Sequence, residues 1–141
     1  MTPLAAQLAH AYRREERLYA RIRDLVKEQA RLMETQPDPG AVLDLCSRAE
    51  TLMAEITTIE EALEPAKTEW GKVRDDPDGE LNAVLASVEA LIEEIARTQE
   101  RVQRGLVDYM RQQKERTDGA RRSIKVSRAS RLYRPERGQV G

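Results

Sequence analysis

The chain has 141 residues, of which 40% are hydrophobic, 35% are charged and only 4% are aromatic, and its net charge is −1. This composition fits one domain of long helices with narrow apolar stripes, and the net charge gives no overall attraction to nucleic acid. The chain lacks the roughly 18–20 consecutive apolar residues of a membrane-spanning helix and the apolar segment of a signal peptide, so we expect a cytoplasmic protein without membrane insertion.

The first predicted helix covers residues 4–34. Its stripe repeats at four- and three-residue spacings, the heptad period that keeps one face toward a partner helix, and Pro3 suits its first turn. Glu15 and Gln29 interrupt the apolar series, and we interpret them as register-setting or partly exposed residues, not as catalytic ones. The stripe consists of Leu4, Leu8, Ala11, Glu15, Leu18, Ile22, Leu25, Gln29 and Leu32.

The second predicted helix covers residues 41–74 and follows the turn "QPDPG". Its stripe holds a strict three-four spacing through Pro65, which favours one kinked, continuous helix. The lone Cys46 has no disulfide partner in the chain, and its place beside Leu45 predicts a small buried hydrophobe. The stripe consists of Val42, Leu45, Ala49, Leu52, Ile56, Ile59, Leu63, Ala66, Trp70 and Val73.

The third predicted helix covers residues 80–110 and follows the acidic turn "RDDPDGE". After Met110 the apolar series fails. Residues 111–141 contain ten Lys or Arg and three Asp or Glu (net +7), against fourteen and twenty-two in residues 1–110 (net −8). The apolar positions are Leu81, Val84 with Leu85, Val88, Leu91 with Ile92, Ile95, Gln99, Val102, Leu106, Tyr109 and Met110.

These elements predict an all-α fold. The two short connections favour an elongated antiparallel, coiled-coil-like three-helix bundle over residues 1–110, with residues 111–141 as a basic extension that is either helical or flexible. Phosphate loops, zinc-type Cys/His spacings and hydrolase motifs are absent from the sequence. We therefore expect a binding protein without catalytic residues, metal or cofactor.

The basic extension, residues 111–141, allows several interpretations. Its Lys and Arg residues from position 122 onward recur every three residues, a period that spirals round an α-helix and gives no single basic face. With only Tyr133 for base stacking, we expect no specific nucleic-acid partner. Leu132 and Tyr133 either cap the bundle or order on a partner, and both alternatives stay open.

The order of features resembles the FlgN-like flagellar export chaperones. The resemblance covers Leu18 to Pro135 and rests on "LYARIRDLVKEQARLMET", "AVLDLCSRAETLMAEITTIEEALEPAKTEW", "LNAVLASVEALIEEIARTQERVQRGLVDYMRQQKERTDGARRS" and the late "LYRPE". It implies a cytoplasmic helical chaperone that binds the terminal helix of hook-associated proteins, keeps them unassembled and delivers them to the membrane export gate. The tail is unusually rich in arginine for this family.

The resemblance also implies where partners bind. The substrate-protein surface would lie from Val102 onward, and the gate would be contacted through the late tyrosine. A monomer or weak homodimer is expected. The alternatives are a coiled-coil adaptor or stalk protein of a flagellar or type III export apparatus, and a small nucleic-acid-associated helical protein. The candidate residues are Val102, Leu106, Tyr109, Met110, Ile124 and Val126 for the client, and Leu132 and Tyr133 for the gate.

Overall fold

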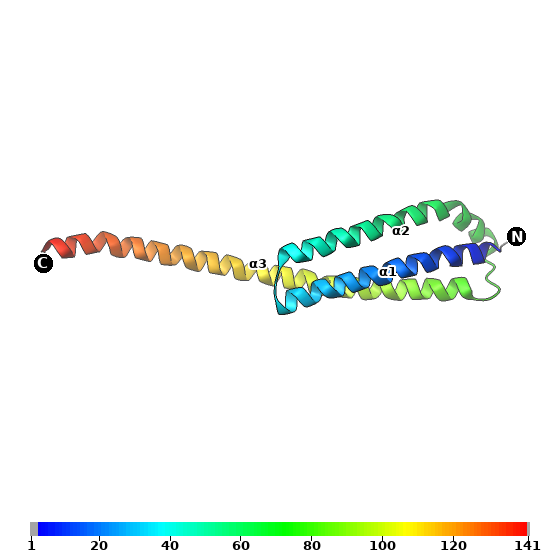
Figure 1. Ribbon diagram of the computed structural model, residues 1–141, viewed down its shortest axis with the longest axis horizontal. Coiled ribbons are helices and arrows are strands. Elements are labelled where there is room, and N and C mark those ends of the chain that lie inside the picture. Colours follow the sequence, from blue (N-terminus) through cyan, green and yellow to red (C-terminus); the bar gives the residue numbers. More distant parts are fainter. Residues whose placement is uncertain (1–2, 141) are drawn as a thin grey trace. The chain divides into compact units, whose positions relative to one another are not determined.

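The computed structural model describes the backbone of residues 3–140 and the side chains of residues 3–126 and of Arg128. The chain forms three α-helices: α1 is Leu4–Thr35, α2 is Pro39–Val73 and α3 is Glu80–Val140 (Figure 1). It divides into two compact units, the first ending at Gly105 and the second beginning at Leu106. In the first unit α1, α2 and the N-terminal part of α3 pack together, so the predicted all-α three-helix bundle is confirmed.

The helix ends use the residues that the sequence marks as helix breakers. The Asp38 carboxylate accepts a hydrogen bond from the Ala41 amide (3.1 Å), and Pro39 occupies the first turn of α2. The helix continues through Pro65, as predicted. At the start of α3, the Asp76 carboxylate accepts from the amides of Leu81 (3.2 Å) and Asn82 (2.9 Å), which would otherwise lack partners.

Two residues in the α2–α3 connection have left-handed backbone conformations, Arg74 with φ 50° and Gly79 with φ 68°. Such a conformation costs a non-glycine residue about 1 kcal/mol. We therefore expect Arg74→Gly to raise the free energy of unfolding by about 0.5–1 kcal/mol and Gly79→Ala to lower it by about 1 kcal/mol. Urea denaturation followed by circular dichroism measures both. Equal effects of the two substitutions would contradict this account.

Helix α1 is the central helix of the first unit. It buries two adjacent stripes where the sequence predicted one, because one stripe faces α2 and the other faces α3. Leu25 and Leu32 are consequently only half-buried, and Val26, Ala30 and Met33 take core positions. The residues buried on α1 are Ala5, Leu8, Ala9, Glu15, Leu18, Ile22, Val26, Gln29, Ala30 and Met33.

Helix α2 runs antiparallel to α1. The buried Gln29, near the end of α1, donates from Nε2 to the Val42 carbonyl near the start of α2 (3.0 Å). At the other end, the start of α1 packs against Leu63, Ala66 and Trp70 near the end of α2. The alternative of partial exposure for Gln29 and Glu15 is therefore wrong, since both are buried.

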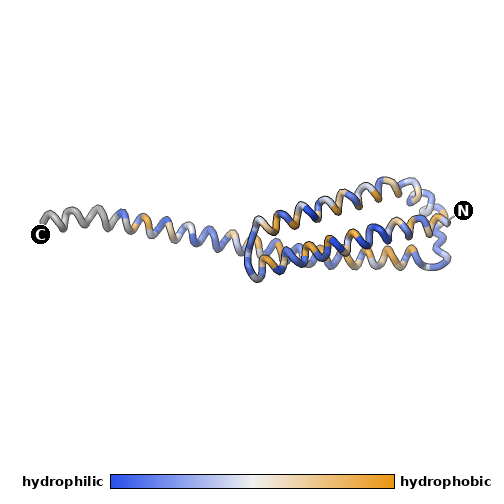
Figure 2. The backbone as a smooth tube through the Cα atoms, viewed as in Figure 1, coloured by the Kyte–Doolittle hydropathy of each residue, from blue (hydrophilic) through white to orange (hydrophobic). Residues whose placement is uncertain are grey.

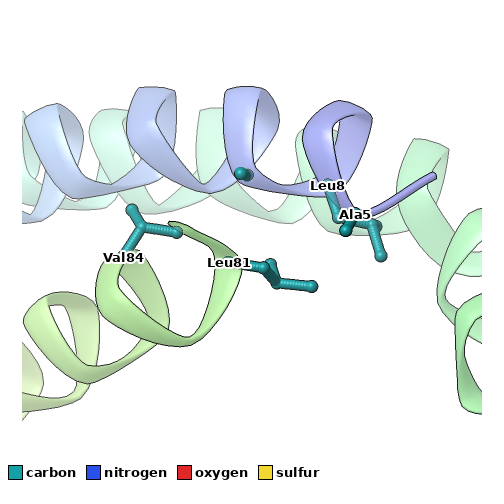
Figure 3. Packing of buried hydrophobic residues seen from close by; sticks show 5 residues of the cluster. Ala5, Leu8, Leu81 and Val84 are labelled. Carbon is teal, nitrogen blue, oxygen red and sulfur yellow. The ribbon is translucent and has the colours of Figure 1, made fainter. Parts of the chain in front are cut away.

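Helix α3 runs parallel to α1 through the first unit. Three ion pairs join the helices, Arg13 with Glu80, Lys27 with Glu94 and Glu34 with Arg101, and the α3 residue always lies 67 positions after its partner. In Figure 3, Ala5 and Leu8 of α1 face Leu81 and Val84 of α3. The buried stripe of α3 consists of Leu81, Val84, Val88, Leu91, Ile95, Thr98 and Val102.

The stripe on α3 departs from the sequence prediction, because Thr98 is buried in place of Gln99, and Ile92 and Met110 are exposed. A strict three-four spacing from Leu91 leads to Thr98, whose hydroxyl donates to the Glu94 carbonyl (2.9 Å) and so stays satisfied. Gly105 ends the first unit at a close approach, because a Cβ atom there would lie 3.1 Å from Cβ of Met33.

The second unit begins at Leu106 and is helical to Val140. Of the two alternatives for the basic extension, the helical one is therefore confirmed. Hydrophilic positions predominate among its coloured residues (Figure 2). Arg122, Lys125 and Arg128 are exposed, and at about 100° per residue they spiral round the helix without forming one basic face.

Candidate functional site

An apolar groove of about 470 Å³ opens between α2 and α3 in the first unit. Tyr19 and Ile22 of α1 contribute to it between the two helices. Met53 on α2 and Ile92 on α3 are 42% and 44% exposed, which is unusual for large apolar side chains within a bundle. The lining from α2 consists of Cys46, Ala49, Glu50 and Met53, and the lining from α3 of Ile92, Ile95, Ala96 and Gln99.

The sizes of the side chains explain why the groove is open at this level of the bundle. At the other end of α2, Leu63 and Trp70 are large enough to pack against the core that α1 and α3 form, and Leu85 of α3 joins them. At the groove, α2 offers Cys46 and Ala49 and α3 offers Ala96. These small side chains leave the space between α2 and α3 unfilled.

The groove was not found from the sequence, although a signal for it exists. Leu85, Ile92 and Ala96 form a second apolar row on α3 beside the buried stripe. A second apolar row that faces the small residues Cys46 and Ala49 on α2 indicates a face without a full partner.

Cys46 lines this groove and is exposed. The prediction that it is a small buried hydrophobe is therefore wrong. It fails because Cys46 lies one position beyond the stripe that faces α1, and a helix turns by about 100° at each residue. Its thiol lies 4.0 Å from a carboxylate oxygen of Glu50.

A buried carboxyl group lies deeper in the bundle. Glu15 of α1 is 1% exposed, and its Oε2 atom has no hydrogen-bond partner among the described side chains. Burial, together with the neighbouring carboxylate of Glu60 on α2, raises the pKa of Glu15 to about 8. Lys67 Nζ lies 2.9 Å from the Glu60 carboxylate. Glu15 is thus predominantly protonated at neutral pH, and Glu60 and Lys67 form the charged pair beside it.

Two tyrosines lie near this carboxyl pair. Burial, followed by the negative charges of Glu60 and Glu15, raises the pKa values of the Tyr12 and Tyr19 hydroxyl groups. Tyr19 also lines the groove, so this tyrosine is close to both the buried carboxyl pair and the groove. No group of three or more His, Cys, Asp or Glu side chains in the described part of the chain is arranged to hold a metal ion.

The residues predicted to bind a client occupy different environments. Val102 is buried in the first unit, whereas Leu106 and Tyr109 in the second unit are half-buried. Met110, Ile124 and Val126 are exposed, and so is Val107, which the sequence analysis did not select. Their role in client binding stays a prediction. The side chains of Leu132 and Tyr133 lie outside the described residues.

No family model, no curated protein and no solved structure matches this chain. Over the described residues, every helix is too short or too polar to cross a membrane. Among the described residues, the groove between α2 and α3 is the candidate binding site.

Proposed function

We propose that this protein binds an amphipathic helix of a partner protein in the groove between α2 and α3, and that it acts as a cytoplasmic FlgN-like export chaperone. In this role it binds the terminal helix of a hook-associated flagellar protein, keeps that protein unassembled and delivers it to the export gate. The apolar groove, with Met53 and Ile92 exposed in its walls, is the observation that carries the proposal.

The dimensions of the groove suit one helix. Its α2 wall extends from Cys46 to Met53 and its α3 wall from Ile92 to Gln99, so each wall is about 12 Å long and accommodates roughly two helical turns. A client helix with apolar residues at i, i+3, i+4 and i+7 would cover both walls. Covering them removes Met53 and Ile92 from water and replaces the contacts that clients otherwise make with one another.

The second unit supplies a further surface for this role. Val107, Met110, Ile124 and Val126 are exposed there on a helix with few other apolar side chains. We propose that Leu106, Tyr109, Met110, Ile124 and Val126 extend the contact with the client. Val102 contributes by supporting the helix from within the bundle. Leu132 and Tyr133 remain the proposed contacts with the export gate.

Calorimetric titration of the full chain with a purified hook-associated protein from the same organism tests the proposal. We expect a one-to-one complex. Replacing a groove-wall side chain by a charge, as in Ile92→Asp, should weaken binding roughly 30-fold or more, because a charged group cannot be buried against the client without a partner. Met110→Asp, in the second unit, measures the contribution of the further surface.

Cys46 provides an independent readout of groove occupancy. As the chain's single cysteine, in the groove wall, it should react more slowly with a thiol reagent when the client is bound.

Val73→Asp is the matched control for Ile92→Asp, since Val73 is exposed on α2 but does not line the groove. If Ile92→Asp and Val73→Asp bind the client equally well, the groove is not the site. An obligate dimer that binds no client would favour the coiled-coil adaptor.

A further inference from the structure

We infer that the helix received by the groove carries Lys or Arg beside its apolar face, an inference that rests on the proposed function and specifies its partner. The groove is bordered on both sides by exposed carboxylates. Glu50 lines it on α2. On α3, Glu89, Glu93 and Glu100 lie on the outward side of the wall formed by Ile92, Ala96 and Gln99, as the turn of about 100° per residue requires.

These four glutamates form no ion pair with any described side chain. The basic residues of the same helices do not pair with them. Arg48 lines a different pocket with Arg21, on the α1–α2 side of the bundle. Arg101 pairs with Glu34 of α1. Arg97 and Arg104 follow Glu93 and Glu100 by four residues but form no ion pair with them among the described side chains.

An apolar groove with acidic borders discriminates between partners. A helix with acidic flanks would place like charges along both borders, whereas basic flanks would pair with them. Each exposed pair contributes little, but several of them amount to roughly a tenfold preference. Glu93 and Glu100 are one heptad apart, so the complementary partner carries basic residues at the same spacing, about 10 Å along its axis.

Three synthetic peptides of about 20 residues test this inference with the full-length protein. They share one Leu/Ala apolar face and differ only at the flanking positions, which are all Lys, all Gln or all Glu. Fluorescence anisotropy gives the dissociation constants, and protection of the Cys46 thiol reports on the groove. We expect the Lys peptide to bind roughly tenfold more tightly than the Gln peptide, the Glu peptide to bind most weakly, and the differences to shrink at high salt.

A pair of double variants assigns the preference to these glutamates. Glu50→Lys with Glu93→Lys alters both borders of the groove and should reverse the order of the Lys and Glu peptides. Asp44→Lys with Glu55→Lys makes the same change of charge at exposed positions of α2 outside the groove, and should leave the order unchanged. Circular dichroism establishes that both variants keep the helical content of the wild type.

The outcomes separate this inference from the proposed function. Equal binding of the three peptides, or preference for the Glu peptide, would overturn the inference and leave helix binding intact. If no peptide binds or protects Cys46, both are overturned. A concentration-dependent dimer that the peptides disrupt would mean that a second copy of the chain fills the groove, and would overturn the assignment to a partner protein.

Discussion

Raising the pH from about 5 to about 8.5 should lower the free energy of unfolding of the wild-type protein by an amount on the order of a few kcal/mol. The same change of pH should lower the free energy of unfolding of Glu15→Gln by much less. Burial, together with the Glu60 carboxylate, raises the pKa of Glu15 from 4.5 to about 8. Between these two values the folded protein holds a proton that the unfolded chain has released. The stabilisation that comes from this proton is therefore fully present below the pKa of Glu15 in the unfolded chain. It is lost as the pH rises through the higher pKa of Glu15 in the folded protein.

Glu60 acts in the opposite direction at lower pH. Burial alone would raise its pKa, but the interactions with the protonated carboxyl group of Glu15 and with the Lys67 ammonium group outweigh burial, and the net shift is downward. The stability from Glu60 is therefore present above its ordinary pKa and is lost as the pH falls through its lower, folded value. The two carboxyl groups together predict maximal stability at mildly acidic pH, where Glu15 is protonated and Glu60 is ionised.

Urea denaturation of three proteins at several pH values measures this dependence. The proteins are the wild type, Glu15→Gln, which keeps the shape of the side chain without its titration, and Glu55→Gln as a control at an exposed position of α2. Glu55→Gln should follow the wild type. A wild type whose stability is constant from about pH 5 to 8.5, or a Glu15→Gln variant with the wild-type slope, would show that Glu15 is ionised in the folded state.

Leu8→Ala should lower the free energy of unfolding by about 2–5 kcal/mol. Leu8 is 2% exposed and lies in the core cluster with Ala5, Ala9, Leu81 and Val84, where α1 meets α3. Trp70 and Leu63 of α2 pack against the same cluster. Truncation leaves a cavity that three helices border, and none of them can move to fill it without losing its own contacts.

Leu43→Ala is the matched control for this prediction, because Leu43 is the same residue type but is 67% exposed. It should change the free energy of unfolding by less than about 0.5 kcal/mol. Urea denaturation monitored through Trp70 fluorescence gives both values. Similar losses in the two variants would mean that the core cluster is not the tightly packed part of the first unit.

The three helices could be predicted from the sequence because helix ends and apolar stripes depend on residues that are close together in the chain. Pro39 and Asp38 define the start of α2, and Asp76 with Gly79 precedes α3. The strict spacing of the α2 stripe correctly predicted that the helix continues through Pro65. The position of α1 between two helices was not predictable in this way, since a single stripe does not tell how many neighbours a helix has.

The groove and the buried carboxyl pair depend on contacts between distant parts of the chain. Glu15 and Glu60 are 45 positions apart, and only the antiparallel packing of α1 and α2 brings them together. The predicted burial of Cys46 was wrong because its exposure depends on whether α3 covers that side of α2. Periodicity identifies the face that packs best, but it does not show where a neighbouring face remains uncovered.

The three ion pairs between α1 and α3 also restrict how the helices can align. Two of them place the basic residue on α1 and the third places it on α3, since Glu34 pairs with Arg101. Sliding α3 by one heptad would again place apolar positions of its stripe against α1, so the stripe pattern alone does not exclude the error, although the close approach of Gly105 to Met33 would be lost. In one direction, however, the slide sets Lys27 opposite Arg101, and in the other it sets Glu34 opposite Glu94. The ion pairs thus act together with the close approach of Gly105 and Met33 in favouring the observed alignment, even though each pair contributes little to stability.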